Sequence, residues 1–183
     1  HQIGIHPGFK TYNNLVNMTK TVQVFRAMQN ELFQPEPISG RQHYLRWKTG
    51  TTESILNDSG ITSDSTLSFA DTGGFRCGTS KPFILFDLSR GSETQVTEYP
   101  LIVMETTYFG AGYLNLRTDD IYTHMNEMKS WCKIMGGCFT VLWHNSSLQT
   151  DTYREIYDQV IENNDKLETP DVITEKDIFD KLT

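Results

Sequence analysis

The stretch Gly136-Gly-Cys-Phe-Thr-Val-Leu-Trp-His-Asn145 decides the fold class, because it joins a helix to a buried strand. The preceding residues have the apolar spacing of an amphipathic helix, with Ile121, Met125, Met128 and Trp131 on one face. The two glycines end that helix, and the apolar run after them ends in His144. A helix that returns to a short buried strand is the unit from which α/β folds are built.

The same alternation continues through the rest of the chain. Buried or half-buried strands are expected at residues 1–5, 43–47, 65–70, 82–86 and 99–104. Helices are expected from about Tyr12 to Leu32, from Glu53 to Asn57, from Asp119 or Asp120, and from near Tyr153. Thr51 or Thr52 would cap the second of these helices, and Gly60 would end it. We therefore expect an α/β fold with a largely parallel sheet or barrel.

The first long helix should bury one face. Its apolar residues at helical spacing are Leu15, Met18, Val22, Phe25 and Met28, and we expect them in the core.

Composition excludes several functional classes. The chain has 183 residues, 37% of them hydrophobic, which suits one domain with a substantial core. It contains no apolar window long enough to span a membrane and no signal-peptide pattern at its start. The three cysteines form no Cys-x-x-Cys pair, so we expect a reducing, cytoplasmic setting and no disulfide framework.

The net charge of −7 is unevenly distributed. Residues 151–183 hold ten acidic and four basic residues, whereas residues 1–150 hold thirteen and twelve. A chain without a basic surface is a poor ligand for phosphate backbones, so nucleic acid is not an expected partner. We predict a domain over residues 1–166 and an acidic tail or terminal helix over residues 167–183.

Polar residues that could do chemistry fall at or near the expected strand ends. They are His6, the cluster Arg41 to His43, Asp71 and His144. In parallel α/β folds the active site lies at the carboxyl ends of the strands. Histidine in that position suits general acid work near neutral pH. We therefore expect these residues to share one site.

Four motifs in order give the sequence a more specific likeness. They are Gly4-Ile-His-Pro-Gly8, Arg41-Gln-His-Tyr-Leu-Arg46, Ala70-Asp-Thr-Gly-Gly-Phe-Arg-Cys-Gly-Thr79 and Leu142-Trp-His-Asn145. This order resembles the polysaccharide deacetylase superfamily, particularly its divergent bacterial branch associated with surface-polysaccharide gene clusters. The resemblance covers about residues 1–157.

The resemblance implies a distorted (β/α) barrel that removes N- or O-linked acetyl groups from a carbohydrate, using one divalent metal, usually zinc. His6 matches a metal-binding histidine of this family. Arg41 matches the arginine that orients the catalytic aspartate, and Asp71 matches the aspartate that tunes the general acid. His144 matches the histidine that protonates the departing amine or alcohol.

Two departures from the family pattern shape these expectations. The family's first motif, a strand ending in paired aspartates, should precede His1, so we expect an incomplete domain that lacks its N-terminal strand or an inactive relative. Lys10 stands where the family has its second metal-binding histidine, and lysine is a poor zinc ligand. His43 is the candidate that would replace it as a ligand.

Substrate contacts are expected from Tyr44, Arg76 and Trp143. Alternative interpretations remain open: Asp71 would simply form a turn into the glycines after it, and Arg76 would anchor that loop. The alternative function is a catalytically inactive module that binds carbohydrate or a protein, with Tyr44, Trp47, Tyr108 and Trp143 as stacking platforms.

Overall fold

The structure is a computed structural model, and it describes residues 3–32 and 36–162. The predicted acidic tail at residues 167–183 lies outside the described residues, as does the end of the predicted domain. The helices are α1 (Leu15–Leu32), α2 (Thr52–Ser59), α3 (Glu105–Phe109), α4 (Thr118–Ile134) and α5 (Asp151–Ile161). The strands are β1 (Ser39–Gly40), β2 (Ser63–Asp64), β3 (Phe83–Asp87), β4 (Ser92–Glu98), β5 (Val103–Met104) and β6 (Val141–Leu142).

The strands form a mixed but mostly parallel arrangement. The larger sheet has the order β1-β2-β4-β3, in which β1 and β4 run parallel to β2, and β3 is antiparallel to β4. Ile5 adds a parallel bridge to Gly40 beside β1. The smaller sheet pairs β5 with β6 in parallel. The expected α/β class with largely parallel strands is therefore present, while the described residues do not close a complete barrel.

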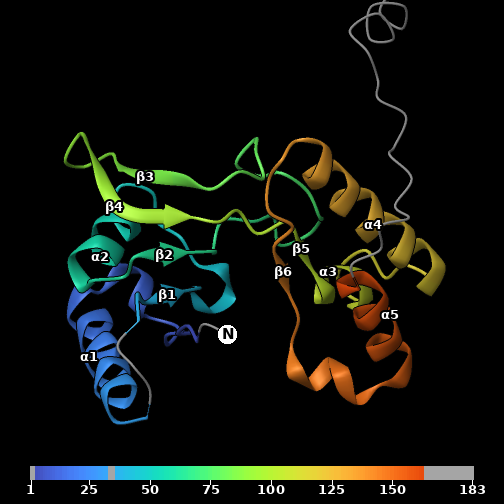
Figure 1. Ribbon diagram of the computed structural model, residues 1–183, viewed down its shortest axis with the longest axis horizontal. Helices are drawn as coiled ribbons and strands as arrows, with labels where there is room; N and C mark the ends of the chain where they lie inside the picture. Colours follow the sequence, from blue (N-terminus) through green and yellow to red (C-terminus); the bar gives the residue numbers. More distant parts are fainter. Residues whose placement is uncertain (1–2, 33–35, 163–183) are drawn as a thin grey trace, which may run out of the picture.

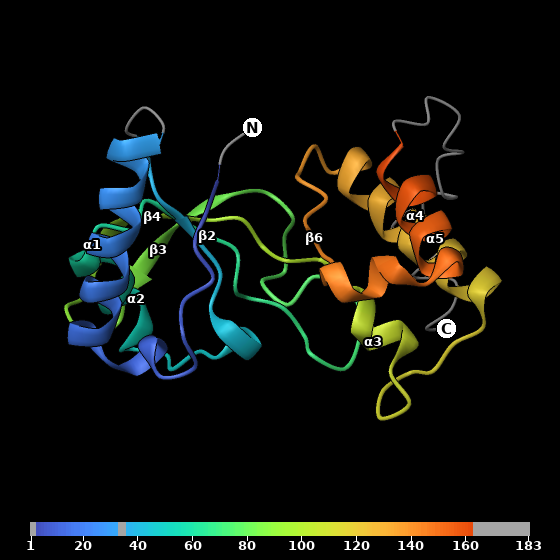
Figure 2. The ribbon, with the colours of Figure 1, turned by 90° about the horizontal axis from the view of Figure 1, so that it is seen from below.

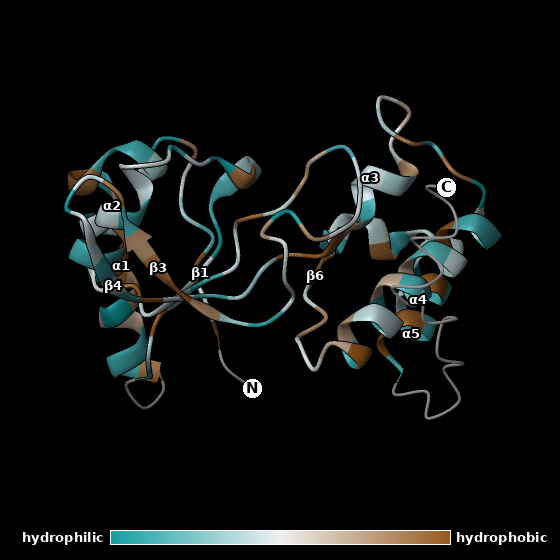
Figure 3. Cartoon of the chain, turned by 90° about the horizontal axis from the view of Figure 1, so that it is seen from above, coloured by the Kyte–Doolittle hydropathy of each residue, from teal (hydrophilic) through white to brown (hydrophobic). Residues whose placement is uncertain are grey.

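The molecule has two apolar cores, one in each half (Figures 1 and 2). The first core lies between α1, α2 and the larger sheet and centres on Met18, Ile38 and Leu56. The second joins β5 to α3, α4 and α5 around residues such as Tyr108 and Met125. Figure 3 shows β3 and β6 in hydrophobic colours, in contrast to the hydrophilic outer turns of the helices.

The helices confirm most of the sequence pattern. In α1, Met18 and Val22 are buried and Phe25 packs against the same core, as expected from their spacing. Leu15 and Met28 are instead 41% and 49% exposed, because they flank the buried stripe. Gly60 ends α2 in the left-handed conformation, with φ of 86°, which glycine adopts without steric cost.

Two expected strands are absent from the described structure. Residues 43–45 form a 3-10 turn, in which Tyr44 and Leu45 have φ of 57° and 50°, so the strand predicted at residues 43–47 is wrong. The strand predicted at residues 65–70 is replaced by β2, which ends at Asp64. The reason is the same in both places: side chains and turns supply the hydrogen bonds that a longer strand would have made. Thr66 N–H, for example, binds the Asp64 carboxylate.

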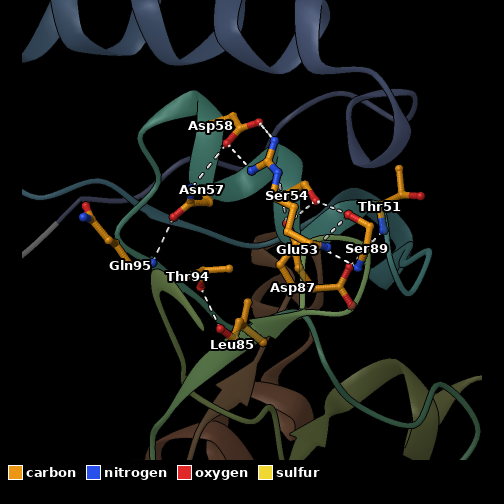
Figure 4. A network of polar contacts seen from close by, with 11 residues as sticks. Thr51, Glu53, Ser54, Asn57, Asp58, Leu85, Asp87, Ser89, Thr94 and Gln95 are labelled. Atoms are coloured by element: carbon orange, nitrogen blue, oxygen red, sulfur yellow. Dashed lines mark hydrogen bonds and ion pairs between the residues drawn. The ribbon is translucent and has the colours of Figure 1, made fainter. Parts of the chain in front are cut away.

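The strand predicted at residues 82–86 is present as β3, whereas β4, a mostly polar run that lies between β2 and β3, was missed, so the hairpin of β3 and β4 was not predicted. A polar network fastens its turn to α2 (Figure 4). Asp87 accepts the Ser89 and Arg90 backbone N–H groups and the hydroxyl of Ser54, while Arg90 forms an ion pair with Asp58. These donors, the Ser54 hydroxyl first, lower the pKa of Asp87 to about 2. The network therefore holds the turn between β3 and β4 against α2.

None of the helices in residues 3–32 and 36–162 combines the length and the apolar character that a membrane crossing requires.

Candidate functional site

A cleft of about 490 Å³ lies between the two sheets, on the side where the parallel strands end. Its walls are formed by His6, Gln42, His43, Tyr44, Leu45, Ala70, Met104, Thr106, Tyr113, Leu142 and His144. His6 directly follows the Ile5 bridge, His43 lies three residues beyond β1, and His144 lies two residues beyond β6. The structure thus gathers four predicted site residues, His6, His43, Tyr44 and His144, at one end of the strands.

His144 is held by a carboxylate that the sequence analysis did not select. Its Nδ1 lies 2.6 Å from Glu105 Oε1, and the same oxygen accepts the His144 backbone N–H at 2.9 Å and the Ser147 hydroxyl at 3.0 Å. Glu105 is fully buried at the start of α3, directly after β5, while the His144 side chain is 47% exposed. The contact uses Nδ1, so Nε2 is the ring nitrogen left to act in the cleft.

His6 and His43 form a second group on the opposite wall. Their rings stack with centroids 4.8 Å apart and an interplanar angle of 24°. His6 Nδ1 lies 2.8 Å from the Arg41 carbonyl oxygen, so that nitrogen carries the proton it donates. Partial removal of the ring from water lowers the pKa of His6, and the positive charges of His43, Arg41 and His144 act in the same direction, against the hydrogen bond to Arg41. This histidine is therefore favoured as a neutral ring.

Arg41 lies beneath the cleft and does not line it. Its Nε donates to the Ser65 carbonyl and hydroxyl oxygens, and its Nη1 approaches the Val141 carbonyl oxygen at 3.5 Å, which links the two sheets. Burial lowers the pKa of Arg41, and the charges of Asp64 and Glu98 oppose that shift. Arg41 is therefore close to the buried carboxyl groups of Asp64 and Glu98. The resemblance implied a different partner, the catalytic aspartate of the family's first motif.

Besides Arg41, three predicted site residues do not line the cleft: Asp71, Arg76 and Trp143. Asp71 is exposed in the loop after Ala70, and the carboxylate beside His144 is that of Glu105. Arg76 donates to the Ser68 carbonyl oxygen at 2.7 Å, which matches the loop-anchoring interpretation. The structure therefore gives Glu105 the place beside His144 that was expected for Asp71.

Trp143 packs into the second core, edge-on to Phe109 and Tyr157. Alternation along β6 points its ring away from the cleft, while its neighbours Leu142 and His144 line it. The substrate contact predicted for Trp143 is therefore corrected to a packing role.

Exposed tyrosines shape the mouth of the cleft. Tyr44 is 76% exposed and Tyr113 is 50% exposed. Tyr44 contacts the ring of His43 and meets Phe9 edge to face. Tyr44 therefore lies on the cleft wall with much of its ring in water, and its substrate contact stays a prediction.

The residues that the structure describes do not fit the three-ligand metal site that the resemblance implies. The stacked rings of His6 and His43 lie nearly parallel, whereas ligands of one tetrahedral ion converge on it. Across the described ranges, no group of three histidine, cysteine or acidic side chains is arranged to hold a metal. Lys10, at the family's second ligand position, lines a separate hollow next to the start of α1.

Sequence reasoning missed Glu105, Asp64 and Glu98. Glu105 had a usable signal, because it is a charged residue directly after the apolar run that ends at Met104, the same placement that identified His144. Asp64 ends β2, which the sequence pattern had placed at residues 65–70, and Glu98 ends β4, which it had missed. Their pairing could therefore not be predicted from the sequence.

Comparison with known proteins gives a likeness in structure alone. No protein-family model and no curated protein sequence matches this chain. A solved structure from Mycobacterium smegmatis, named as that of a candidate polysaccharide deacetylase, superposes with a TM-score of 0.60 at 15% identity. The match covers 90% of this chain and 58% of the Mycobacterium protein, so the chain spans less than two thirds of that protein.

The fold is similar to that of this deacetylase-like protein. At 15% identity the similarity supports the arrangement of helices and strands. It does not establish an activity, which depends on the residues of the site.

Proposed function

We propose that this chain is part of a hydrolase that removes acetyl groups from a carbohydrate, with His144 as the proton donor. The observation that carries the proposal is the Glu105–His144 pair: a buried carboxylate fixes one ring nitrogen and leaves the other in a cleft at the strand ends. The four ordered motifs and the similarity in fold support the same reaction class.

In this reaction water adds to the acetyl carbonyl, the bond to the sugar nitrogen or oxygen breaks, and acetate leaves. His144 Nε2 gives its proton to the departing nitrogen or oxygen, and Glu105 stabilises the ring in its charged form before that transfer. A group in this role contributes roughly 10²- to 10⁴-fold to the rate. Activation of the water is assigned to no residue of the described part.

The cleft walls support a neutral sugar as the substrate. They contain no lysine, arginine, aspartate or glutamate among their described residues, and their charge rests on histidines alone. Tyr44 and Tyr113 offer ring faces to stack on a sugar, while Met104 and Leu142 offer apolar surface for an acetyl methyl group.

The test is acetate release from N-acetylated and O-acetylated oligosaccharides by the chain and its His144→Gln variant. We expect the variant to lose at least about a hundredfold in turnover. His124→Gln is the matched control, because His124 lies on α4 and contacts Tyr108 outside the cleft. Zinc is added and removed as a separate arm, since His6 and His43 alone do not complete its ligand set.

A second candidate is the carbohydrate-binding module without catalysis. Its specific support is the exposed ring of Tyr44 beside two histidines that do not form a metal site. Oligosaccharide binding that needs Tyr44, with no acetate release under either zinc condition, would establish this function and reject the hydrolase.

A further inference from the structure

Asp64 and Glu98 end neighbouring parallel strands and lie directly opposite each other in the register of β2 and β4. Their side chains are on the inner face of the sheet, with residue exposures of 1% and 0%. Two carboxyl groups side by side in an apolar interior repel each other strongly if both are ionised. Their surroundings therefore have to accommodate at most one full charge.

The hydrogen bonds of the two groups show how this is achieved. Asp64 Oδ2 accepts the Thr66 backbone N–H at 2.9 Å, and Glu98 Oε1 accepts the Leu67 backbone N–H at 2.9 Å. The remaining oxygens, Asp64 Oδ1 and Glu98 Oε2, are buried, and no other donor in the described part reaches them. Asp64 and Glu98 are opposite each other in the register, and ionised carboxylates only accept hydrogen bonds, so one of the two groups must carry a proton if these oxygens are to be satisfied by each other.

We propose that Asp64 and Glu98 share one proton, and that this shared proton is a pH-sensitive latch for the floor of the cleft. The latch reaches the cleft through three contacts. Asp64 holds the Thr66 N–H, the Thr66 hydroxyl accepts the Gln42 N–H at 2.9 Å, and Gln42 lines the cleft next to His43. This inference is independent of the proposed hydrolysis.

The electrostatic setting agrees with the geometry. Burial, with the charge of Asp64 added to it, raises the pKa of Glu98 to about 9. Burial also raises the pKa of Asp64 to about 6, against the hydrogen bonds from Thr66 and Glu98. The other charged or titratable groups that face the pair are Arg41, which attracts its charge, and Cys77, which feels the charge of Glu98. The stable form is one proton and one negative charge beside Arg41.

The sign of the pH effect follows from these shifts. An unfolded glutamate titrates near 4.5, whereas folded Glu98 keeps its proton until about 9. Between those values the folded chain binds more protons than the unfolded chain, so stability falls as the pH rises. Loss of the shared proton leaves two buried charges and releases the backbone of residues 65–67 under the cleft.

Glu98→Gln tests the latch, because the amide can donate permanently to Asp64 Oδ1 and cannot ionise. We expect the urea midpoint of the parent chain to fall between pH 6 and pH 9, the values near which the two groups titrate, and that of Glu98→Gln to fall much less. Glu93→Gln is the matched control: it makes the same substitution at the exposed start of β4 and should follow the parent profile. Parallel profiles for the parent and Glu98→Gln would overturn the proposal.

Infrared spectroscopy provides a second measurement that needs no unfolding. The parent chain at neutral pH should show the carbonyl band of a protonated, buried carboxylic acid that disappears in Glu98→Gln and is retained in Glu93→Gln. If Glu98→Gln does not fold, Asp64→Asn tests the same pair from the other strand. If the parent spectrum has no band of a protonated carboxylic acid at neutral pH, the proposal of a shared proton is rejected.

Discussion

The two halves of the molecule bury carboxylates in opposite ways. In the second half, Glu105 stands alone and receives three donors on one oxygen, one of them the ring of a histidine in the cleft. In the first half, Asp64 and Glu98 lie opposite each other, and each accepts one backbone N–H. Burial alone therefore does not give a carboxylate its role. What differs is the neighbour, which is a histidine of the cleft wall for Glu105 and a second carboxyl group for Asp64 and Glu98.

The comparison predicts that changing Glu105 has the largest effect on function. Glu105→Ala leaves the His144 N–H, its Nδ1 and the Ser147 hydroxyl without their acceptor in a buried setting. We expect turnover to fall by about a hundredfold or more, together with a loss of about 1–3 kcal/mol in the free energy of unfolding. Acetate release and urea titration measure the two effects separately.

Glu105→Gln separates positioning from folding. The amide keeps the size of the side chain and one acceptor oxygen but cannot stabilise a charged His144 ring. Its turnover should fall nearly as far as that of Glu105→Ala, with much less loss of stability. If the double variant with His144→Gln is no worse than His144→Gln alone, the two residues act as one unit.

A smaller effect is expected in the first half, from Arg41→Gln. This change removes the positive charge near Asp64 and Glu98 and the link from β1 to the Val141 carbonyl oxygen. We expect a loss of about 1–3 kcal/mol in the free energy of unfolding at neutral pH. Adding Glu98→Gln should recover part of that loss, because a neutral partner needs less counter-charge. Additive losses in the double variant would contradict the coupling between Arg41 and the pair.

The sequence predicted the second half better than the first. The alternation of helix, glycine turn and strand located α4, β6 and His144, because each element there is long or ends in a clear signal. In the first half, contacts from segments distant in sequence complete β1 and β2. Strand ends of that kind depend on long-range partners, which local periodicity does not record.

The candidate site shows the same division. His6, His43 and His144 were brought together as expected because strand-end placement is a rule of parallel folds. Glu105 was not predicted, because the family resemblance implies Asp71 as the carboxylate beside His144. Trp143 was misassigned because an aromatic residue next to a site histidine points to the other face of the strand.

A smaller effect is expected at Tyr44, where one substitution should change binding and stability in different ways. Its φ of 57° is a left-handed conformation that favours asparagine or glycine over tyrosine. Tyr44→Asn should therefore leave the free energy of unfolding unchanged or raise it by up to about 1 kcal/mol. The same variant should weaken oligosaccharide binding several-fold, measured by calorimetry. Tighter binding would show that the exposed ring has no part in recognition.

The smallest effect is expected at Asp71. Its side chain is exposed, and the position beside His144 is filled by Glu105 at 2.6 Å. Asp71→Asn preserves shape and turn-forming ability and removes only the charge, so kcat/KM for acetate release should stay within about twofold of the parent. Measured beside Glu105→Gln, this variant decides between the two carboxylates. A loss at Asp71 as large as that at Glu105 would mean that the loop carrying Asp71 closes over the cleft when substrate binds, and that both acids serve His144 in turn.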